Sequence, residues 1–223
     1  MVVAVWLTLA IAPPRTTNRR NLLDSSIGPA ILGLLAGRVV AMLLEDPRSL
    51  ARPADILVLR GGVELWPAVS MGVVAGFLAT RRDGRNEWAA LADSAPSALV
   101  AYASYEAACL ARSGCFGPVS KIGLIPPGQT SAMVPVGLVV AITIVALAAA
   151  VRQRTLSDGF GGVALAIGWL ALVRSLASIW LPKIGNGPTR QHVESVVVLV
   201  ASASLALARW VYRRWTTPVE SVA

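Results

Sequence analysis

Three arginines in the sequence lie within or at the end of long apolar stretches. Arg38 and Arg174 lie deep inside such stretches, and Arg112 follows an otherwise apolar one and precedes small, turn-forming residues. An arginine within a membrane-spanning segment costs from about 2.5 to more than 10 kcal/mol, so it usually has an anionic partner and a function. A guanidinium group can donate two parallel hydrogen bonds to a phosphate. The sequence therefore predicts that the three arginines bind one shared anion, such as a phospholipid phosphate.

The same arginines also have a purely structural interpretation. Arg38 and Arg174 could pair with Glu45, Glu64 or Glu106, or could extend their charged ends toward the membrane surface, and so serve only to fix the packing of helices. Sequence spacing does not show which carboxylate lies beside which arginine. The sequence therefore leaves both interpretations open.

Few residues could accept a proton at such a site. The sequence has one histidine, His192, and histidine is the side chain that most often exchanges protons near neutral pH. A buried carboxylate can also act as a base, which makes Glu64 and Glu106 the alternatives. A lone histidine at the end of a membrane span also commonly serves in packing or capping. The sequence leaves these three candidates for the base open.

The two cysteines, Cys109 and Cys115, lie six residues apart. Neither their spacing nor their neighbours predicts a metal site or a disulfide. We expect both to be small packing residues with protonated thiols. No metal ion and no cofactor is expected.

The composition indicates an integral membrane protein. Of the 223 residues, 55% are hydrophobic and 14% are charged, a balance that a water-soluble domain does not have. The net charge of +8 comes mostly from arginines in short loops. Because no soluble basic module is present, a role in binding nucleic acid is excluded. We expect a single transmembrane domain over residues 1–223.

Apolar stretches between polar or basic loops predict a bundle of seven transmembrane segments, all of them helical. The expected spans are 2–12, 25–44, 65–80, 94–115, 132–151, 160–181 and 193–211. The first is shorter than the roughly 20 residues that a full span requires. The fourth is the most polar, so it should face protein or water and not lipid. Gly28, Gly33 and Gly37 in the second span predict close contact with a neighbouring helix.

Arginine placement predicts the orientation of these spans. Basic residues accumulate in the loops after the first, third and fifth segments and in the C-terminal tail, which places these parts in the cytoplasm and the N-terminus outside. With a rise of about 1.5 Å per residue, Arg38, Arg112 and Arg174 then fall in the outer halves of their spans, and Arg60 falls in the same layer. An outer-leaflet phosphate would meet this layer.

The stretch 112–116 reads Arg-Ser-Gly-Cys-Phe. It is similar to the signature Arg-Ile-Gly-Asn-Phe of the bacterial prolipoprotein diacylglyceryl transferases, a family that several stretches of this chain resemble in the right order. The other matching stretches are 21–24, 33–39, 55–62, 161–174 and the glutamine that opens the last span. The resemblance implies a seven-helix plasma-membrane enzyme that moves diacylglycerol from phosphatidylglycerol to a lipoprotein cysteine. It also makes Arg112 and Arg174 the counterparts of the family's two essential arginines.

Together the arginine layer and the resemblance suggest a phospholipid-binding set. Its members are Arg38, Arg60, Gly61, Gly62, Arg112, Gly114, Arg174 and Gln191. Small Gly114, like Gly117 beyond it, is expected to let backbone and ligand approach closely beside Arg112. The expected partners are an anionic phospholipid, specifically phosphatidylglycerol, and a prolipoprotein.

Departures from the family pattern keep a second function open. After Gly61-Gly62 the family has a Phe-His-Gly-Gly stretch with its usual candidate base, whereas this chain reads Val-Glu-Leu-Trp-Pro. The signature asparagine is Cys115, and the glutamate one turn after the second arginine is Ser178. The sequence therefore supports either a diacylglyceryl transferase or a catalytically inactive relative. The relative would bind anionic phospholipid and act as an assembly partner of another membrane protein.

Overall fold

The computed structural model describes residues 19–45, 47–48, 62–112, 114–153, 159–181 and 188–216. The described residues up to Ser94 form one compact unit, and those from Ala95 onward form a second. Each unit has its own helix packing.

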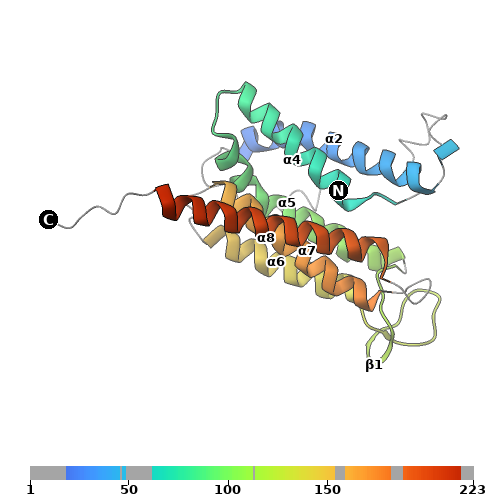
Figure 1. Ribbon diagram of the computed structural model, residues 1–223. Helices are drawn as coiled ribbons and strands as arrows, with labels where there is room; N and C mark the ends of the chain where they lie inside the picture. The colour runs from blue at the N-terminus through green and yellow to red at the C-terminus, as the bar shows by residue number, and fades with distance from the viewer. Residues whose placement is uncertain are drawn as a thin grey trace. The chain divides into compact units, whose positions relative to one another are not determined.

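The first unit is built on two long antiparallel helices that lie side by side (Figure 1). They are α2 (Arg19–Glu45) and α4 (Leu65–Arg82). The start of α5 (Glu87–Cys109) packs on the end of α4, where the rings of Phe77 and Trp88 lie 5.3 Å apart. Arg81 and Arg82 close α4, and basic residues are favourable in the last turn of a helix.

Glycines set the separation between α2 and α4. A Cβ atom added to Gly33 would lie 2.6 Å from the carbonyl oxygen of Ala68, and one added to Gly37 would lie 2.6 Å from that of Glu64. Only glycine permits this approach of backbone to backbone. The predicted close contact is therefore confirmed for Gly33 and Gly37, whereas Gly28 has no atom within 4 Å of such a position and lies away from the contact.

The second unit contains the rest of α5 and five further elements. These are η2 (Leu110–Arg112), β1 (Val119–Leu124), α6 (Val136–Gln153), α7 (Gly159–Trp180) and α8 (Arg190–Thr216). Helix α7 packs against both α6 and α8 (Figure 1). Small and aliphatic residues form the core of the second unit, where Ile144, Ala148 and Ala171 have no exposed surface. The described chain is thus helical apart from one short hairpin, and the all-helical fold class is confirmed in that sense.

Both ends of helix α5 differ from those of the fourth predicted span, 94–115. Helix α5 begins at Glu87, seven residues before the predicted start, because the Asn86 side chain accepts a hydrogen bond from the Ala89 N–H at 3.0 Å and caps the helix. It ends at Cys109, so Arg112 lies in a short 3₁₀ turn beyond the α-helix.

The fifth predicted span begins later than expected because its first residues belong to a hairpin. The Ser120 N–H donates to the Ala132 carbonyl at 2.9 Å, and the Val134 N–H donates to the Pro118 carbonyl at 3.1 Å. This pairing places β1 opposite the residues before α6. The predicted connection of glycines and prolines therefore contains a strand, which β-branched Val119 and Ile122 favour.

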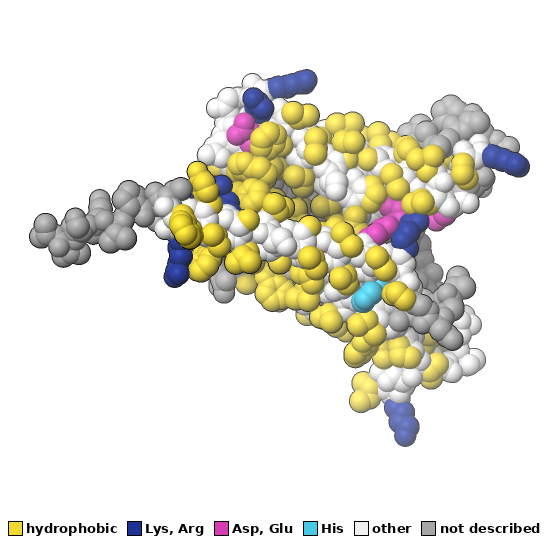
Figure 2. Space-filling view, in the orientation of Figure 1, with side chains coloured by type: hydrophobic (Ala, Val, Ile, Leu, Met, Phe, Trp, Pro, Cys, Tyr) yellow, Lys and Arg dark blue, Asp and Glu magenta, His cyan; other side chains and the backbone are white. Residues whose placement is uncertain are grey.

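Three described helices are long and apolar enough to cross a membrane. They are Ser26–Glu45, Gly159–Trp180 and Arg190–Trp215, and Val136–Val151 is a shorter apolar helix. Apolar side chains cover much of the visible surface of the helices, with charged side chains mostly toward their ends (Figure 2). Span 2–12 lies outside the described residues. The seven-segment count and the orientation stay predictions.

Candidate functional site

A buried ion pair joins α5 to α7 in the second unit. The Arg174 guanidinium donates to Glu106 Oε1 at 2.9 Å, with the two side chains only 11% and 5% exposed. A second guanidinium nitrogen donates to Gln191 Oε1 on α8 at 3.1 Å. Tyr102, one turn before Glu106, donates its hydroxyl to the same carboxylate oxygen. Arg174 on α7 is therefore held by residues of two other helices, α5 and α8.

This pair bears on the two interpretations of Arg174. The structural alternative named a pairing with Glu106, and the described geometry shows that pairing. The expectation of an uncompensated positive charge at Arg174 is wrong, because a buried carboxylate 68 residues earlier in the sequence neutralises it. A guanidinium group has five N–H donors, and these two contacts leave three that no other described residue engages. Arg174 can still bind an additional acceptor.

His192 follows Gln191 in α8, and its ring contacts α7 close to Arg174 in the sequence. Its Nδ1 is 2.8 Å from the Ser178 hydroxyl oxygen and 3.1 Å from the Ser175 carbonyl oxygen. Its backbone N–H donates to the Thr189 carbonyl at 3.0 Å, in the first turn of the helix. The imidazole is only partly buried, and its cyan side chain reaches the surface in Figure 2. The histidine is thus oriented on one side and accessible on the other.

These two sets of contacts use adjacent residues in both helices. Arg174 and Ser175 are neighbours in α7, and their partners Gln191 and His192 are neighbours in α8. An arginine that can bind an anion and an imidazole that can exchange a proton are therefore held at one junction of two helices. Glu106 completes the group, so the structure brings four predicted site residues together.

The turn that contains Arg112 is closed by a disulfide, which the sequence analysis did not predict. Cys109 and Cys115 are bonded, with their Cα atoms 5.9 Å apart. Helix α5 ends at Cys109, and Cys115 has a left-handed backbone with φ of 58°, so the chain turns back on itself. The sequence did not predict the bond because the expected helix ran to residue 115, six residues beyond the actual end of α5 at Cys109. The prediction of two packing thiols is wrong.

The glycines near this turn also differ from expectation. A Cβ atom on Gly114 would lie 2.9 Å from the Cys109 sulfur, and one on Gly117 would lie 2.8 Å from Val136 and 3.0 Å from the Trp180 carbonyl. The space beside both residues is therefore filled by protein. Arg112 is described only by its backbone in η2, so its expected contact with lipid stays a prediction.

The remaining predicted residues belong to the first unit. Arg38 is 7% exposed and donates to the Gly62 carbonyl at 3.1 Å. The Glu64 N–H donates to the Gly37 carbonyl at 3.1 Å, which ties the start of α4 to α2. Arg38, Gly62 and Glu64 therefore gather at one end of the helix pair. Arg60 and Gly61 lie outside the described residues.

An open apolar groove lies at the end of α7. Its volume is about 730 Å³, and it is lined by Gly117, Pro118, Val119, Met133, Ile179, Trp180 and Leu181. Its lining includes Ile179, the residue after Ser178 in α7. It is of a size and polarity that suit an apolar chain.

Two contributing residues, Ser175 and Ser178, were missed by sequence reasoning. The contact between Tyr102 and Glu106 had a usable signal, because residues four apart face each other on a helix. Ser178 was noticed only as a departure from a family motif. The carbonyl of Ser175 has no sequence signal, since any residue supplies one.

Three described apolar helices long enough to cross a bilayer, together with a buried arginine–carboxylate pair, are features of a membrane protein. A sequence model of the prolipoprotein diacylglyceryl transferase family matches residues 1–208. The chain therefore belongs to this family of membrane proteins, which acts on phospholipid and prolipoprotein. No match was found among curated proteins.

Proposed function

We propose that the protein transfers a diacylglyceryl group from outer-leaflet phosphatidylglycerol to the cysteine thiol of a prolipoprotein at the bacterial plasma membrane. One observation carries the proposal beyond the family match. The Arg174–Gln191 contact and the Ser175–His192 contact join adjacent residues of α7 and α8. A cation that can bind phosphate and a candidate proton acceptor thus lie at the same junction of α7 and α8.

The reaction needs a proton acceptor and a group that holds the leaving phosphate. His192 takes the proton of the acceptor thiol, and the resulting sulfur lone pair forms a bond to the glycerol carbon of the diacylglyceryl group. The bond from that carbon to the phosphate oxygen breaks, and its electron pair leaves with glycerol phosphate. Arg174 stabilises the negative charge on the leaving phosphate through guanidinium donors not used by Glu106 and Gln191.

Other predicted residues extend the proposed phosphate site. Arg112 and Gly114, which belong to the same unit as Arg174 and Gln191, are proposed to contact the headgroup with them. A contribution of Arg38, Arg60, Gly61 and Gly62 stays a prediction from the sequence. The proposed acyl-chain site is the apolar groove at the end of α7, which follows directly after Ser178. Glu64 and Glu106 are the alternative bases. The Oε1 atom of Glu106 is already bonded by Arg174 and Tyr102, which lowers its availability as a base.

The disulfide supports the predicted orientation. Disulfides form in oxidising compartments outside the cytoplasm, and the Cys109–Cys115 bond follows the C-terminal end of α5. The proposed topology, with the N-terminus outside and the C-terminus in the cytoplasm, places that end outside. Both cysteines are bonded, so a single introduced cysteine can be labelled without background. Gln129→Cys should react with an impermeant thiol reagent in intact cells and Asp83→Cys should not, and the reverse pattern would contradict the orientation.

Complementation tests the activity. Expression of the chain in a bacterium depleted of its own diacylglyceryl transferase should restore growth, with mass spectrometry showing diacylglyceryl on the lipoprotein cysteine. His192→Ala should abolish modification while leaving the amount of membrane-inserted protein unchanged, and Arg213→Gln in the last turn of α8 should retain it. Unmodified lipoproteins in the presence of correctly inserted wild-type protein would refute the proposed activity. Full modification by His192→Ala would move the role of base to Glu64 or Glu106.

A second function is favoured by the charge balance of the site. Glu106 neutralises Arg174, and the stretch that carries the family's usual histidine is different here. Both features fit a relative that binds anionic phospholipid without catalysis and assembles with another membrane protein. Copurified phosphatidylglycerol together with no lipoprotein modification would favour this function.

A further inference from the structure

We infer that Ser178 is a positioning residue that, with the main-chain carbonyl of Ser175, holds His192 in the tautomer protonated on Nδ1. The Nε2 lone pair is then the proton acceptor of the ring. The role of this lone pair in thiol activation rests on the proposed function. The tautomer itself is a property of the folded chain and can be tested separately.

The hydrogen-bond geometry selects this tautomer. The Ser175 carbonyl oxygen lies 3.1 Å from Nδ1, and a carbonyl oxygen can only accept a hydrogen bond. A lone pair on Nδ1 would face that oxygen without a proton between them. A proton on Nδ1 satisfies the contact, so Nδ1 is the donor.

Ser178 fits the same arrangement without conflict. Its hydroxyl oxygen lies 2.7 Å from the Ser175 carbonyl, to which it donates, and 2.8 Å from Nδ1. A hydroxyl has one proton, and when that proton points to Ser175 the oxygen accepts from His192. The proton of Nδ1 is then shared between the Ser178 hydroxyl oxygen and the Ser175 carbonyl oxygen.

Because Ser175 and Ser178 are buried, their contacts with Nδ1 determine the tautomer of His192. Ser175 is 6% exposed and Ser178 is 3% exposed, so water cannot readily replace either partner of Nδ1. The imidazole is otherwise only partly buried. Because the two ring nitrogens of a neutral imidazole differ, fixing the proton on one leaves the lone pair on the other. Nε2 is therefore the nitrogen left to accept a proton from an incoming group.

The single histidine of the sequence makes the inference directly measurable. Full-length protein labelled with ¹⁵N-histidine gives imidazole signals from His192 alone, at a pH where the same spectra show a neutral ring. We expect a protonated Nδ1 and an unprotonated Nε2 in the wild type. In Ser178→Ala the Nδ1 signal should shift toward the unprotonated form, because one of its two acceptors is gone. A matched control is Ser202→Ala, a buried α8 serine whose hydroxyl bonds its own helix, and it should leave the spectrum unchanged.

Transfer kinetics supply the second measurement. Ser178→Ala should lower kcat by about tenfold with KM unchanged, because a misoriented base loses part of its effect on the chemical step. Ser202→Ala should keep wild-type kinetics. A protonated Nε2 in the wild type, or a Ser178→Ala spectrum identical to the wild type, would overturn the inference. Absence of transfer by the wild-type protein would refute the proposed function and leave the spectra to decide the tautomer.

Discussion

The two units hold their buried polar groups in different ways. Between α2 and α4 the contacts are made by main chain: Gly33 and Gly37 bring the backbones together, and Arg38 donates to the Gly62 carbonyl. Between α5, α7 and α8 the contacts are made by side chains, with Arg174 bonded to Glu106 and Gln191. The first arrangement depends on the absence of side chains and the second on their identity.

This difference predicts how each unit responds to substitution. A main-chain contact survives most side-chain changes but fails where a glycine gains a Cβ atom. A buried network fails when one partner is removed, because the other is left charged and without compensation in an apolar interior. Both units hold a buried arginine near a candidate base, which is Glu64 for Arg38 in the first unit and Glu106 for Arg174 in the second.

The largest expected effect follows from removing the carboxylate of the buried pair. Glu106→Ala leaves Arg174 buried with the Gln191 amide oxygen as its described partner, and should lower the free energy of unfolding by about 3 to 5 kcal/mol. Thermal unfolding in detergent measures this loss. The double variant Glu106→Gln with Arg174→Gln should lose less than Glu106→Ala alone, because no uncompensated charge remains. A loss below about 1 kcal/mol in Glu106→Ala would contradict the importance of the pair for stability.

A smaller effect is expected in the first unit, where a methyl group is enough to break the main-chain contact. Gly37→Ala places a Cβ atom 2.6 Å from the Glu64 carbonyl oxygen, so α2 and α4 must separate, at a cost of about 1 to 3 kcal/mol. Gly28→Ala is the matched control, since nothing lies within 4 Å of its added Cβ. The same unfolding measurement compares the two, and equal stabilities would show that the close approach is not required.

Lipid retention sharpens the functional side of the comparison. Arg174→Gln and Arg112→Gln should each weaken retention of phosphatidylglycerol by about tenfold or more, since a hydrogen bond to a charged group contributes about 1.5 to 3 kcal/mol. Arg213→Gln, in the last turn of α8, should retain wild-type occupancy. Native mass spectrometry of the purified variants measures the bound lipid. Unchanged occupancy together with lower stability would assign both arginines a structural role only.

The smallest effect is expected at an exposed ion pair. Arg190 and Glu194 lie one turn apart on α8 with their closest atoms at 3.1 Å, but their side chains are 45% and 33% exposed. Glu194→Gln should change the free energy of unfolding by no more than about 0.5 kcal/mol. Added salt should reduce even this difference. A loss comparable to that of Glu106→Ala would mean that burial does not distinguish the two pairs.

The same contrast explains which features the sequence could predict. Apolar stretches predicted α2, α7 and α8 to within a few residues at most ends, apart from an earlier start of α2 and a later end of α8, because burial in lipid demands long apolar runs. Gly33 and Gly37 signalled the close contact because helical spacing is local. The family was recognised from short stretches distributed along the chain, and the match over residues 1–208 confirms it.

Features that depend on the path of the chain could not be predicted in this way. The Arg174–Glu106 pair joins residues 68 positions apart, and it was one of several pairings that the sequence allowed. The disulfide depends on where α5 ends and on the left-handed backbone of Cys115. The contact of His192 with the Ser175 carbonyl uses a main-chain atom, so no residue type could announce it.

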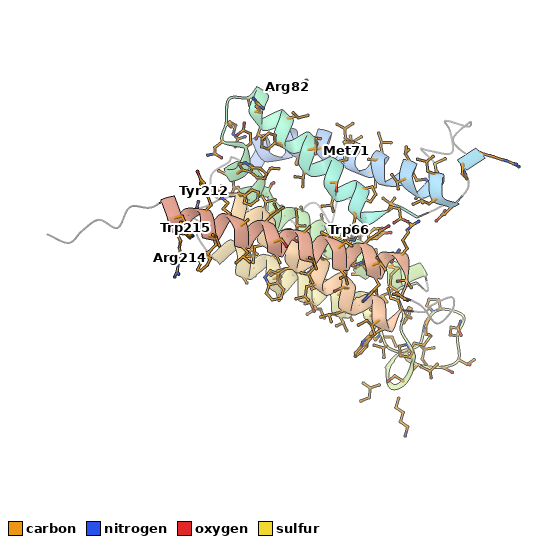
Figure 3. All side chains as sticks on the ribbon, viewed as in Figure 1. Trp66, Met71, Arg82, Tyr212, Arg214 and Trp215 are labelled. Carbon is orange, nitrogen blue, oxygen red and sulfur yellow. A yellow bond between two sulfur atoms is a disulfide. The ribbon has the colours of Figure 1, made fainter. Side chains whose placement is uncertain are left out.

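The length of helix α8 can be compared with the thickness of a bilayer. Its last turns carry Tyr212, Arg214 and Trp215 (Figure 3), and the Arg214 guanidinium lies 4.5 Å from the centre of the Trp210 ring. Tryptophan and arginine together are typical of the boundary between lipid and water. His192 precedes Trp210 by 18 residues of continuous helix, or about 27 Å at 1.5 Å per residue. This length is close to the roughly 30 Å of a bilayer's hydrocarbon core. With Trp210 at one boundary of the bilayer, His192 would lie near the other, and the acceptor thiol of the proposed reaction would need to reach only the level of the headgroups.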